Sequence, residues 1–543
     1  MSSRLESLPA ELLLHIADHI PRPSDLKSLC LTSKLIRVPA TTVLYREIVF
    51  DYRTPTWISF KPDTGMLSKA NPGLAQIRHL TFNASMSEVA PEEVQAMTAV
   101  LNSLPKNTLR SIDCLQFPID EKLAVQLITQ QPSIFSLALG PLTCNLKQSV
   151  DLGLLGSSVF ANVKDLCLPM TAGSIHDFEL YQWLIARAPL RRLTIATTSS
   201  LDSLPAGLSD TDESNGVLSK TLFSHVRDRV LPPAQVECLV LDEINLQHAH
   251  RSFARYIDLS HLRSLELHDC AGTDVFIRAM TDGFEDSGCC KLEHFAYAIK
   301  ETDHIDYKVV EKVLRICSGL KSLMMVGMDD FKNFDLKLLE KHGSTLRSLA
   351  VYPNASDDGG SQPMGLAQDF YATVVEHCQN LRELALQMPD VLLCMDSANT
   401  SPYFDSVMVD LLKLPVLKSL RIFNWPSPGT VFLPNENSDE VLAFINQRNY
   451  LFDVDAFAST HLASLVNKGR TKSAPVICFA GFQGDIVHED RHWIKISEPV
   501  CYVPLKQYDV FGRPQLGLQK MSINDVKYFE PESKILYWPY EIF

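Results

Sequence analysis

The chain lacks the short motifs that many enzymes and metal proteins carry. Its 543 residues contain no CxxC pair, no glycine-rich phosphate loop and no nucleophile elbow. The 13 cysteines are an odd number, spread from Cys30 to Cys501, which favours reduced core thiols in an intracellular compartment over a disulfide framework. The vicinal pair Cys289 and Cys290 could be a redox or metal element, but ordinary burial is the preferred interpretation.

Positive charge and unbroken apolar runs are also scarce. The formal net charge is −14, which argues against a surface that coats nucleic acid or anionic lipid. Glu6, Glu11 and Asp18 interrupt the region where a secretory signal would need apolar residues. The uncharged stretch 123–146 is broken by glutamine, proline and glycine, so it does not predict a membrane span. We therefore expect a cytoplasmic or nuclear protein with no nucleic-acid or membrane partner.

One motif near the C-terminus has the letters of a metalloprotease. His488, Glu489 and His492 match the HExxH pattern, in which two histidines one helical turn apart bind zinc. The flanking residues have the composition of strands, however, and residues four apart on a strand do not share that geometry. A solvated hairpin is the favoured interpretation, and a metal hydrolase is kept as a third hypothesis. We expect no metal and no cofactor.

The first fifty residues carry an apolar stripe that a unit of this size cannot bury alone. Leu8 and Pro9 open a predicted helix in which Leu13, Ile16 and Ala17 recur at helical spacing. Two more segments, SDLKSLCLTSKLIR and VLYREIVF, follow before the pattern changes. This arrangement predicts that a second protein completes the core of the N-terminal unit.

A second pattern recurs through most of the remaining chain. It reads apolar, two others, apolar, one other, apolar, which is typical of a short strand that buries alternate side chains. The copies are Ile77/Leu80/Phe82, Ile112/Leu115/Phe117, Ile134/Leu137/Leu139, Val163/Leu166/Leu168, Leu190/Leu193/Ile195, Val236/Leu239/Leu241, Leu262/Leu265/Leu267, Leu292/Phe295/Tyr297, Leu320/Leu323/Met325, Leu346/Leu349/Val351, Leu381/Leu384/Leu386 and Leu417/Leu420/Ile422. Helical patterns at 177–188, 309–318 and 369–379 lie between them, so the period is that of leucine-rich repeats.

The N-terminal segment resembles an F-box in the order of its motifs. The Leu-Pro-x-Glu-Leu-Leu opening at 8–13, the Asp25-Leu26 pair, the Ser33-Lys34 turn and the Leu44-Tyr45-Arg46 close all occur in sequence. With the repeats, the chain resembles F-box proteins that carry leucine-rich repeats, over residues 1 to about 425.

The resemblance implies an α/β fold class with several parts. A small three-helix F-box at 1–50 leads through a linker or irregular first repeat at 51–73 to a leucine-rich-repeat solenoid at 74–425, a horseshoe of short parallel strands and helices. A polar insert lies at about 197–235, and an irregular capping region follows at 426–543. Within that region, 475–480 predicts a buried strand and Asn437 with Glu440 predicts a helix start.

The resemblance also implies a function without bond chemistry. The chain would be the substrate-recognition subunit of an SCF-type cullin ubiquitin ligase, bound through its F-box to a Skp-family adaptor and, through it, to cullin. A repeat scaffold without a ligase role is the alternative. The positions that match those used by the family for the fold and adaptor contact are Leu8, Pro9, Leu12, Leu13, Ile16, Leu26, Leu29, Ser33, Leu44 and Tyr45.

The substrate would be an unidentified protein held by the repeats. Because residues that flank the central leucines point away from the core, they are candidates for this contact. The candidates are Arg192, Glu266, His268, Tyr352, Arg421 and Phe423.

Overall fold

The structure is a computed structural model in which the chain divides into two compact units. The first comprises Met1–Arg263 with Leu267–Cys289, and the second Ser264–Glu266 with Cys290–Phe543. The residues described are 5, 7–20, 22–51, 71–83, 91–143, 161–169, 171–172, 178–196, 208–209, 233–247, 253, 256–288, 290–299, 307–328, 331–353, 366–394, 397–400, 402–428, 450–469, 474–480, 486–489, 492–495, 499–508, 511–527, 530 and 532–537.

Three helices open the first unit: α1 (Ala10–Asp18), α2 (Pro23–Thr32) and α3 (Lys34–Arg46). Ser33 caps α3, because its side chain accepts a hydrogen bond of 3.2 Å from the Leu35 amide. An ion pair of 2.8 Å between Asp18 and Arg46 joins the ends of α1 and α3. The chain then passes directly from α3 into the first strand, β1 (Glu47–Asp51), so these helices are attached to the sheet without a linker.

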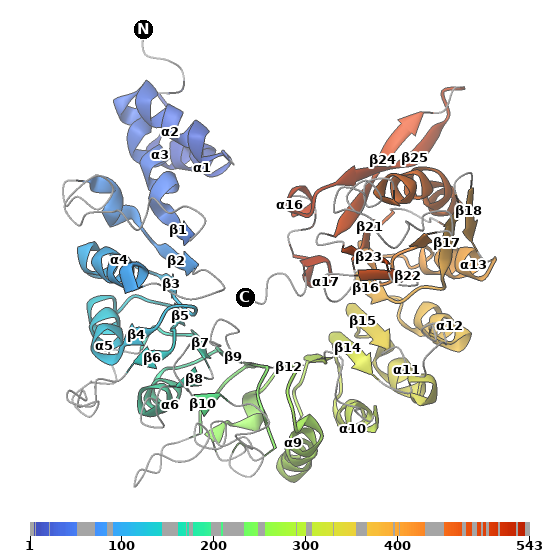
Figure 1. Cartoon of the computed structure of the whole chain (residues 1–543), viewed down its shortest axis with the longest axis horizontal. Coiled ribbons are helices and arrows are strands. Elements are labelled where there is room, and N and C mark those ends of the chain that lie inside the picture. The colour runs from blue at the N-terminus through green and yellow to red at the C-terminus, as the bar shows by residue number, and fades with distance from the viewer. Residues whose placement is uncertain are drawn as a thin grey trace. The chain divides into compact units, whose positions relative to one another are not determined.

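Short parallel strands form the sheet of the first unit, and helices lie to one side of them (Figure 1). After β1, the strands follow the order β2 (His79–Asn83), β3 (Ser111–Asp113), β5 (Ser136–Ala138), β7 (Asp165–Pro169), β9 (Arg192–Ala196), β11 (Cys238–Asp242) and β12 (Ser264–His268), of which Ser264–Glu266 belong to the second unit. The connecting elements are η3 (Pro72–Gln76), α4 (Pro91–Ser103), α5 (Glu121–Gln130), α6 (Phe178–Arg187), η9 (Leu259–His261) and α9 (Thr273–Ser287). Two small pairs, β4 (Ile119–Asp120) with β6 (Leu142–Thr143) and β8 (Thr171–Ala172) with β10 (Leu208–Ser209), complete the unit.

The sheet of the second unit also consists mainly of short parallel strands, but its last two strands are antiparallel. Parallel strands follow the order β13 (His294–Ala298), β14 (Ser322–Met328), β15 (Ser348–Pro353), β16 (Glu383–Leu386), β19 (Ser419–Ile422) and β21 (Val476–Phe479), after which β24 (Val500–Tyr508) and β25 (Pro514–Met521) are antiparallel. The helices are α10 (Lys308–Ile316), η10 (Phe331–Asn333), α11 (Lys337–Gly343), α12 (Gln368–His377), α13 (Pro402–Leu411), the π-helical η12 (Ala458–Leu462), α15 (Ala463–Gly469), α16 (Ile523–Val526) and α17 (Lys534–Tyr537). Smaller sheets contain β17 (Val391–Cys394), β18 (Ser397–Thr400) and β20 (Ser427–Pro428), and β22 (Ile486–Glu489) with β23 (His492–Lys495). The predicted α/β class is thus confirmed, with large, mostly parallel sheets.

The register places the central residues of the predicted repeats beside one another. One buried row runs through Leu80, Ile112, Leu137, Leu166, Leu193 and Leu239, and a second runs through Phe295, Leu323, Leu349, Leu384 and Leu420. The basic residues that precede the strands are also equivalent. In the second unit the amides of Arg347, Arg382 and Lys418 each donate to the carbonyl of the corresponding residue one strand earlier, at 2.7–2.8 Å.

Two details of the predicted repeats are corrected. The copy Ile112/Leu115/Phe117 is wrong by three residues, because Ile112 is the central residue and pairs with Leu80. Cys114, fully buried, takes the place of the third apolar residue. The parallel pairing also extends past residue 425, since Ile477 of β21 pairs with Leu420.

Most of the predicted local elements have counterparts. α6, α10 and α12 confirm the predicted helices at 177–188, 309–318 and 369–379, and β21 confirms the buried strand at 475–480. The helix start at Asn437 and most of the insert at 197–235 lie outside the described residues.

Candidate interaction surfaces

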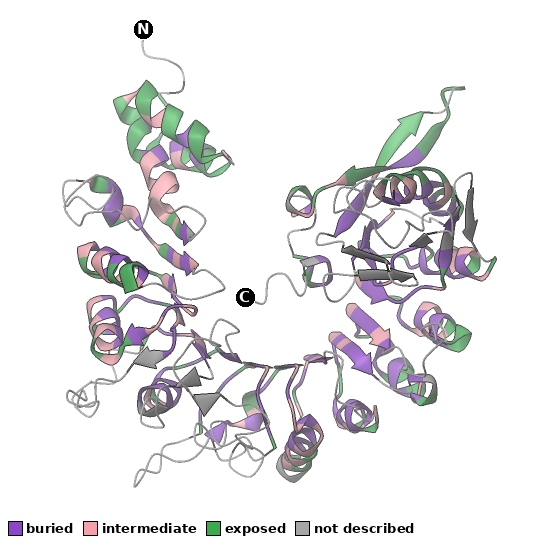
Figure 2. Cartoon of the chain, in the orientation of Figure 1, coloured by how far each residue is buried: buried purple, intermediate pink, exposed green. Residues whose placement is uncertain are grey.

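The three N-terminal helices have many exposed residues, drawn green in Figure 2, and some of these are apolar. Their buried apolar side chains are Leu13, Ala17, Leu26, Ile36 and Ala40. The exposed apolar side chains are Leu12, Ile16, Leu31, Leu35 and Val38, with exposed fractions between 41% and 83%. Leu12 and Ile16 are four residues apart on α1, and Leu35 and Val38 are three apart on α3, so each pair shares a helix face. We call these five exposed residues the N-terminal apolar patch.

The predicted adaptor-binding residues separate into three groups. Leu13 and Leu26 belong to the core, whereas Pro9, Leu12 and Ile16 are exposed. The remaining five are half-buried: Leu8, Leu29, Ser33, Leu44 and Tyr45.

Tyr45 has a structural position where α3 contacts η3. A Cβ atom added to Gly73 would lie 2.5 Å from the Tyr45 ring, so glycine allows this close packing. The Asn71 amide also donates to the Tyr45 hydroxyl at 3.5 Å. Sequence reasoning missed Leu31, Leu35 and Val38, because their exposure depends on how the helices pack.

Two predicted substrate contacts, Arg421 and Phe423, are buried in the second unit. The Arg421 side chain is fully buried, and it donates to the Ala480 carbonyl at 2.9 Å and to the Ile535 carbonyl at 3.0 Å. Its guanidinium lies 5.1 Å from the centre of the Phe423 ring. The prediction that these two residues face a substrate is therefore corrected: they hold the C-terminal helix α17.

The C-terminal segment that contains Ser533 and Ile535 contacts several strands of the second unit. Ile535 packs in a buried cluster with Ala350, Ala385 and Phe423, and Tyr352 packs against the same cluster from a half-buried position. Glu383 accepts a hydrogen bond of 3.1 Å from Ser348. Burial raises the pKa of Glu383, against the opposing effect of hydrogen bonds from Ser533, Ser348 and the Lys534 amide.

The first unit keeps a polar row at the starts of its strands. The register aligns His79, Ser111, Ser136, Asp165 and Arg192, all of them half-buried or exposed. The His79 ring lies 2.7 Å from the Ser111 hydroxyl. Burial raises the pKa of Asp165, and the charges of Arg192 and Arg191 oppose that shift. We call these five residues the polar row.

Two more of the six predicted substrate contacts, Glu266 and His268, lie in β12. Glu266 is half-buried and His268 is buried. Of the six candidates, Arg192 alone is fully on the surface.

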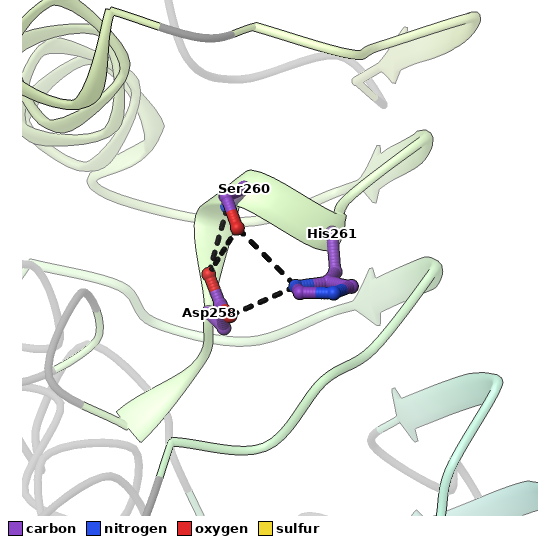
Figure 3. Close-up of polar contacts among 3 residues, drawn as sticks. All are labelled: Asp258, Ser260 and His261. Atoms are coloured by element: carbon purple, nitrogen blue, oxygen red, sulfur yellow. Dashed lines mark hydrogen bonds and ion pairs between the residues drawn. The ribbon is translucent and has the colours of Figure 1, made fainter.

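A cluster of Asp258, Ser260 and His261 has the composition of a catalytic triad (Figure 3). The His261 Nδ1 atom lies 2.8 Å from the Asp258 carboxylate and 3.2 Å from the Ser260 hydroxyl. A triad needs the serine at one ring nitrogen and the aspartate at the other, so this arrangement cannot relay a proton. Asp258 instead caps η9 through the Ser260 amide, at 3.0 Å. Although burial alone would raise it, hydrogen bonds from Ser260 and His261 hold the pKa of Asp258 below its usual value.

The HExxH residues lie on a hairpin and not on a helix. β22 and β23 are antiparallel, and Glu489 pairs with His492. The helical spacing that the zinc motif requires is therefore absent at these residues. Within the described part of the chain, no group of three or more metal-binding side chains is close enough to hold an ion. No helix among the described residues is long and apolar enough to cross a bilayer.

Comparison with known proteins adds no relative. No protein-family description matches the chain, and no curated protein matches it.

Proposed function

We propose that the chain is an F-box protein with leucine-rich repeats and that it recognises substrates for an SCF-type cullin ubiquitin ligase. The observation that carries this proposal is the N-terminal apolar patch. Five exposed large apolar residues on three short helices favour a protein partner, because association would remove their surface from water. The resemblance of the N-terminal motifs to an F-box supports a Skp-family adaptor as that partner.

The repeats supply the second part of the proposal. Buried rows of central residues, parallel pairing and a helix after most strands are what a leucine-rich-repeat solenoid requires. In this arrangement the F-box end binds the adaptor and the strand face binds a protein substrate. The mechanism is proximity: binding raises the effective concentration of a substrate lysine near the ubiquitin-charged enzyme.

We place substrate contact on the polar row of the first unit. The equivalent face of the second unit is covered by α17 at Phe423 and Arg421, whereas Arg192 and Asp165 remain accessible. A face with both charges favours a polar protein segment that presents complementary charges. Arg192→Glu should therefore release bound substrate and leave adaptor binding unchanged.

The adaptor contact is tested with the double variant Ile16→Glu and Leu35→Glu. Both side chains are exposed, so the variant should fold, whereas a charge at the buried Leu13 would unfold the helices. Loss of central apolar contacts costs about 2 kcal/mol or more each, so adaptor affinity should fall at least about 100-fold. The matched control is Phe135→Glu with Val416→Glu, two similarly exposed apolar positions outside these helices.

The same experiment separates the ligase from the scaffold alternative. A ligase subunit should bring down both adaptor and cullin, and the double variant should lose both together. Adaptor without cullin would support the scaffold. Unchanged adaptor binding by the double variant would refute the proposed contact surface.

A further inference from the structure

Two pairs of cysteines in the second unit bring their sulfur atoms to the same distance. The Sγ atoms of Cys290 and Cys317 are 3.3 Å apart, and those of Cys478 and Cys501 are also 3.3 Å apart. A disulfide bond is about 2.05 Å long, so each pair would have to close by about 1.3 Å. Distance alone therefore does not distinguish the two pairs.

Their surroundings differ in access to solvent. Cys290 is half-buried, four residues before β13 begins, and Cys317 is buried at the C-terminal end of α10. Cys478 and Cys501 face each other across β21 and β24, and both are fully buried in an apolar cluster. A small oxidant can thus reach Cys290 directly but must enter the core to reach the second pair.

Each pair has a cationic side chain nearby, Arg421 at Cys501 and Lys341 at Cys290. The Lys341 ammonium donates to the carbonyls of Leu314 and Arg315 at the end of α10, at 3.1 and 2.6 Å. The ammonium therefore lies at the C-terminal end of α10, which is the negative end of the helix dipole.

The thiol of Cys290 is more acidic than an ordinary cysteine. The hydrogen bond with Cys317 lowers the pKa of Cys290 to about 7, against burial and with help from the Leu292 amide and Lys341. The pKa values of Cys317 and Cys501 are both raised, each by contact with its partner sulfur and by burial. A thiolate is the reactive form of cysteine, so Cys290, which is also partly exposed, is the thiol expected to react first.

We propose that Cys290 and Cys317 form a peroxide-responsive dithiol that is reversibly oxidised to a disulfide. The Cys290 thiolate attacks one oxygen of hydrogen peroxide, an S–O bond forms, the O–O bond breaks and hydroxide leaves. The Cys317 thiol then gives up its proton, its sulfur attacks the sulfenic sulfur, and the S–S bond forms as the S–O bond breaks. In total, two thiols and one peroxide give one disulfide and two waters. The bond closes a loop between residues 27 positions apart and joins the segment before β13 to the end of α10.

The test uses the reduced full-length chain, treated with hydrogen peroxide, blocked with an alkylating reagent under denaturing conditions and digested with trypsin. We expect a linked peptide that contains Cys290 and Cys317, lost on treatment with dithiothreitol. It should form faster than any link between Cys478 and Cys501, because Cys290 is partly exposed whereas both cysteines of the second pair are fully buried. The second pair is the matched control, since it has the same sulfur spacing.

Two variants make the result specific. Cys317→Ser should stop the reaction at a sulfenic acid on Cys290, detectable with dimedone. Cys289→Ser should leave the linked peptide in place. The proposal is overturned if the link depends on Cys289, if the two pairs oxidise at equal rates, or if Cys290 stays alkylatable while the other thiols are oxidised.

Discussion

The buried guanidinium of Arg421 should be the main attachment of α17 in the second unit. Its two hydrogen bonds reach residues 59 and 114 positions further along the chain. Arg421→Ala removes both donors and leaves the carbonyls of Ala480 and Ile535 without them. Two such acceptors cost on the order of 2–6 kcal/mol. Relief from burying a charge offsets part of this cost, so we expect a net loss of about 3 kcal/mol.

Chemical denaturation measures the loss, and hydrogen exchange locates it. The denaturation midpoint of the Arg421→Ala variant should fall, and its α17 amides should exchange faster than those of the wild-type protein. Arg421→Met retains much of the side-chain volume without the donors, and it separates packing from hydrogen bonding. Arg192→Ala is the control, because an exposed arginine should change stability by about 0.5 kcal/mol or less. If Arg421→Ala unfolds at the same denaturant concentration and α17 keeps its protection, the reasoning fails.

Two further predictions concern the first unit. Burial raises the pKa of Asp113 above 3.8, against the hydrogen bond from the Leu115 amide. Between pH 3.8 and the raised pKa, the folded state binds more protons than the unfolded state, so stability falls as pH rises through this range. Asp113→Asn should therefore raise the thermal midpoint at neutral pH and not below pH 3.8; an equal gain at both would contradict this. Ser33→Ala removes the cap of α3 and should cost about 1 kcal/mol in chemical denaturation, whereas no loss would mean that the 3.2 Å contact with Leu35 is not a stabilising cap.

The strand rows were predictable because apolar residues at the repeat spacing are buried, even where the residue between them, such as Val240, is buried too. Leu239 and Leu241 are both fully buried, as their spacing indicates. The pattern gave the wrong register at residues 109–117. A shift of three residues there gives an equally apolar match, and Cys114 stands where the pattern has an apolar residue such as leucine. The sequence predicted β21 as a buried strand but not its parallel pairing with β19, because β21 follows a long stretch without the repeat pattern.

The surfaces were harder to predict, since exposure depends on contacts between distant segments. Leu13 and Ile16 belong to one sequence stripe, yet Leu13 is 7% exposed and Ile16 is 41% exposed. Arg421 and Phe423 have the alternation of surface residues, but α17 covers them. Neither fact follows from local spacing.

The N-terminal apolar patch is the central claim, and calorimetric titration with a purified Skp-family adaptor tests it most directly. The unchanged chain should bind with a negative heat-capacity change, because apolar surface is buried on association. The variant with Ile16→Glu and Leu35→Glu should lose this binding, while the Phe135→Glu and Val416→Glu control retains it. Absence of binding by the unchanged chain, or equal binding by both variants, would contradict the account.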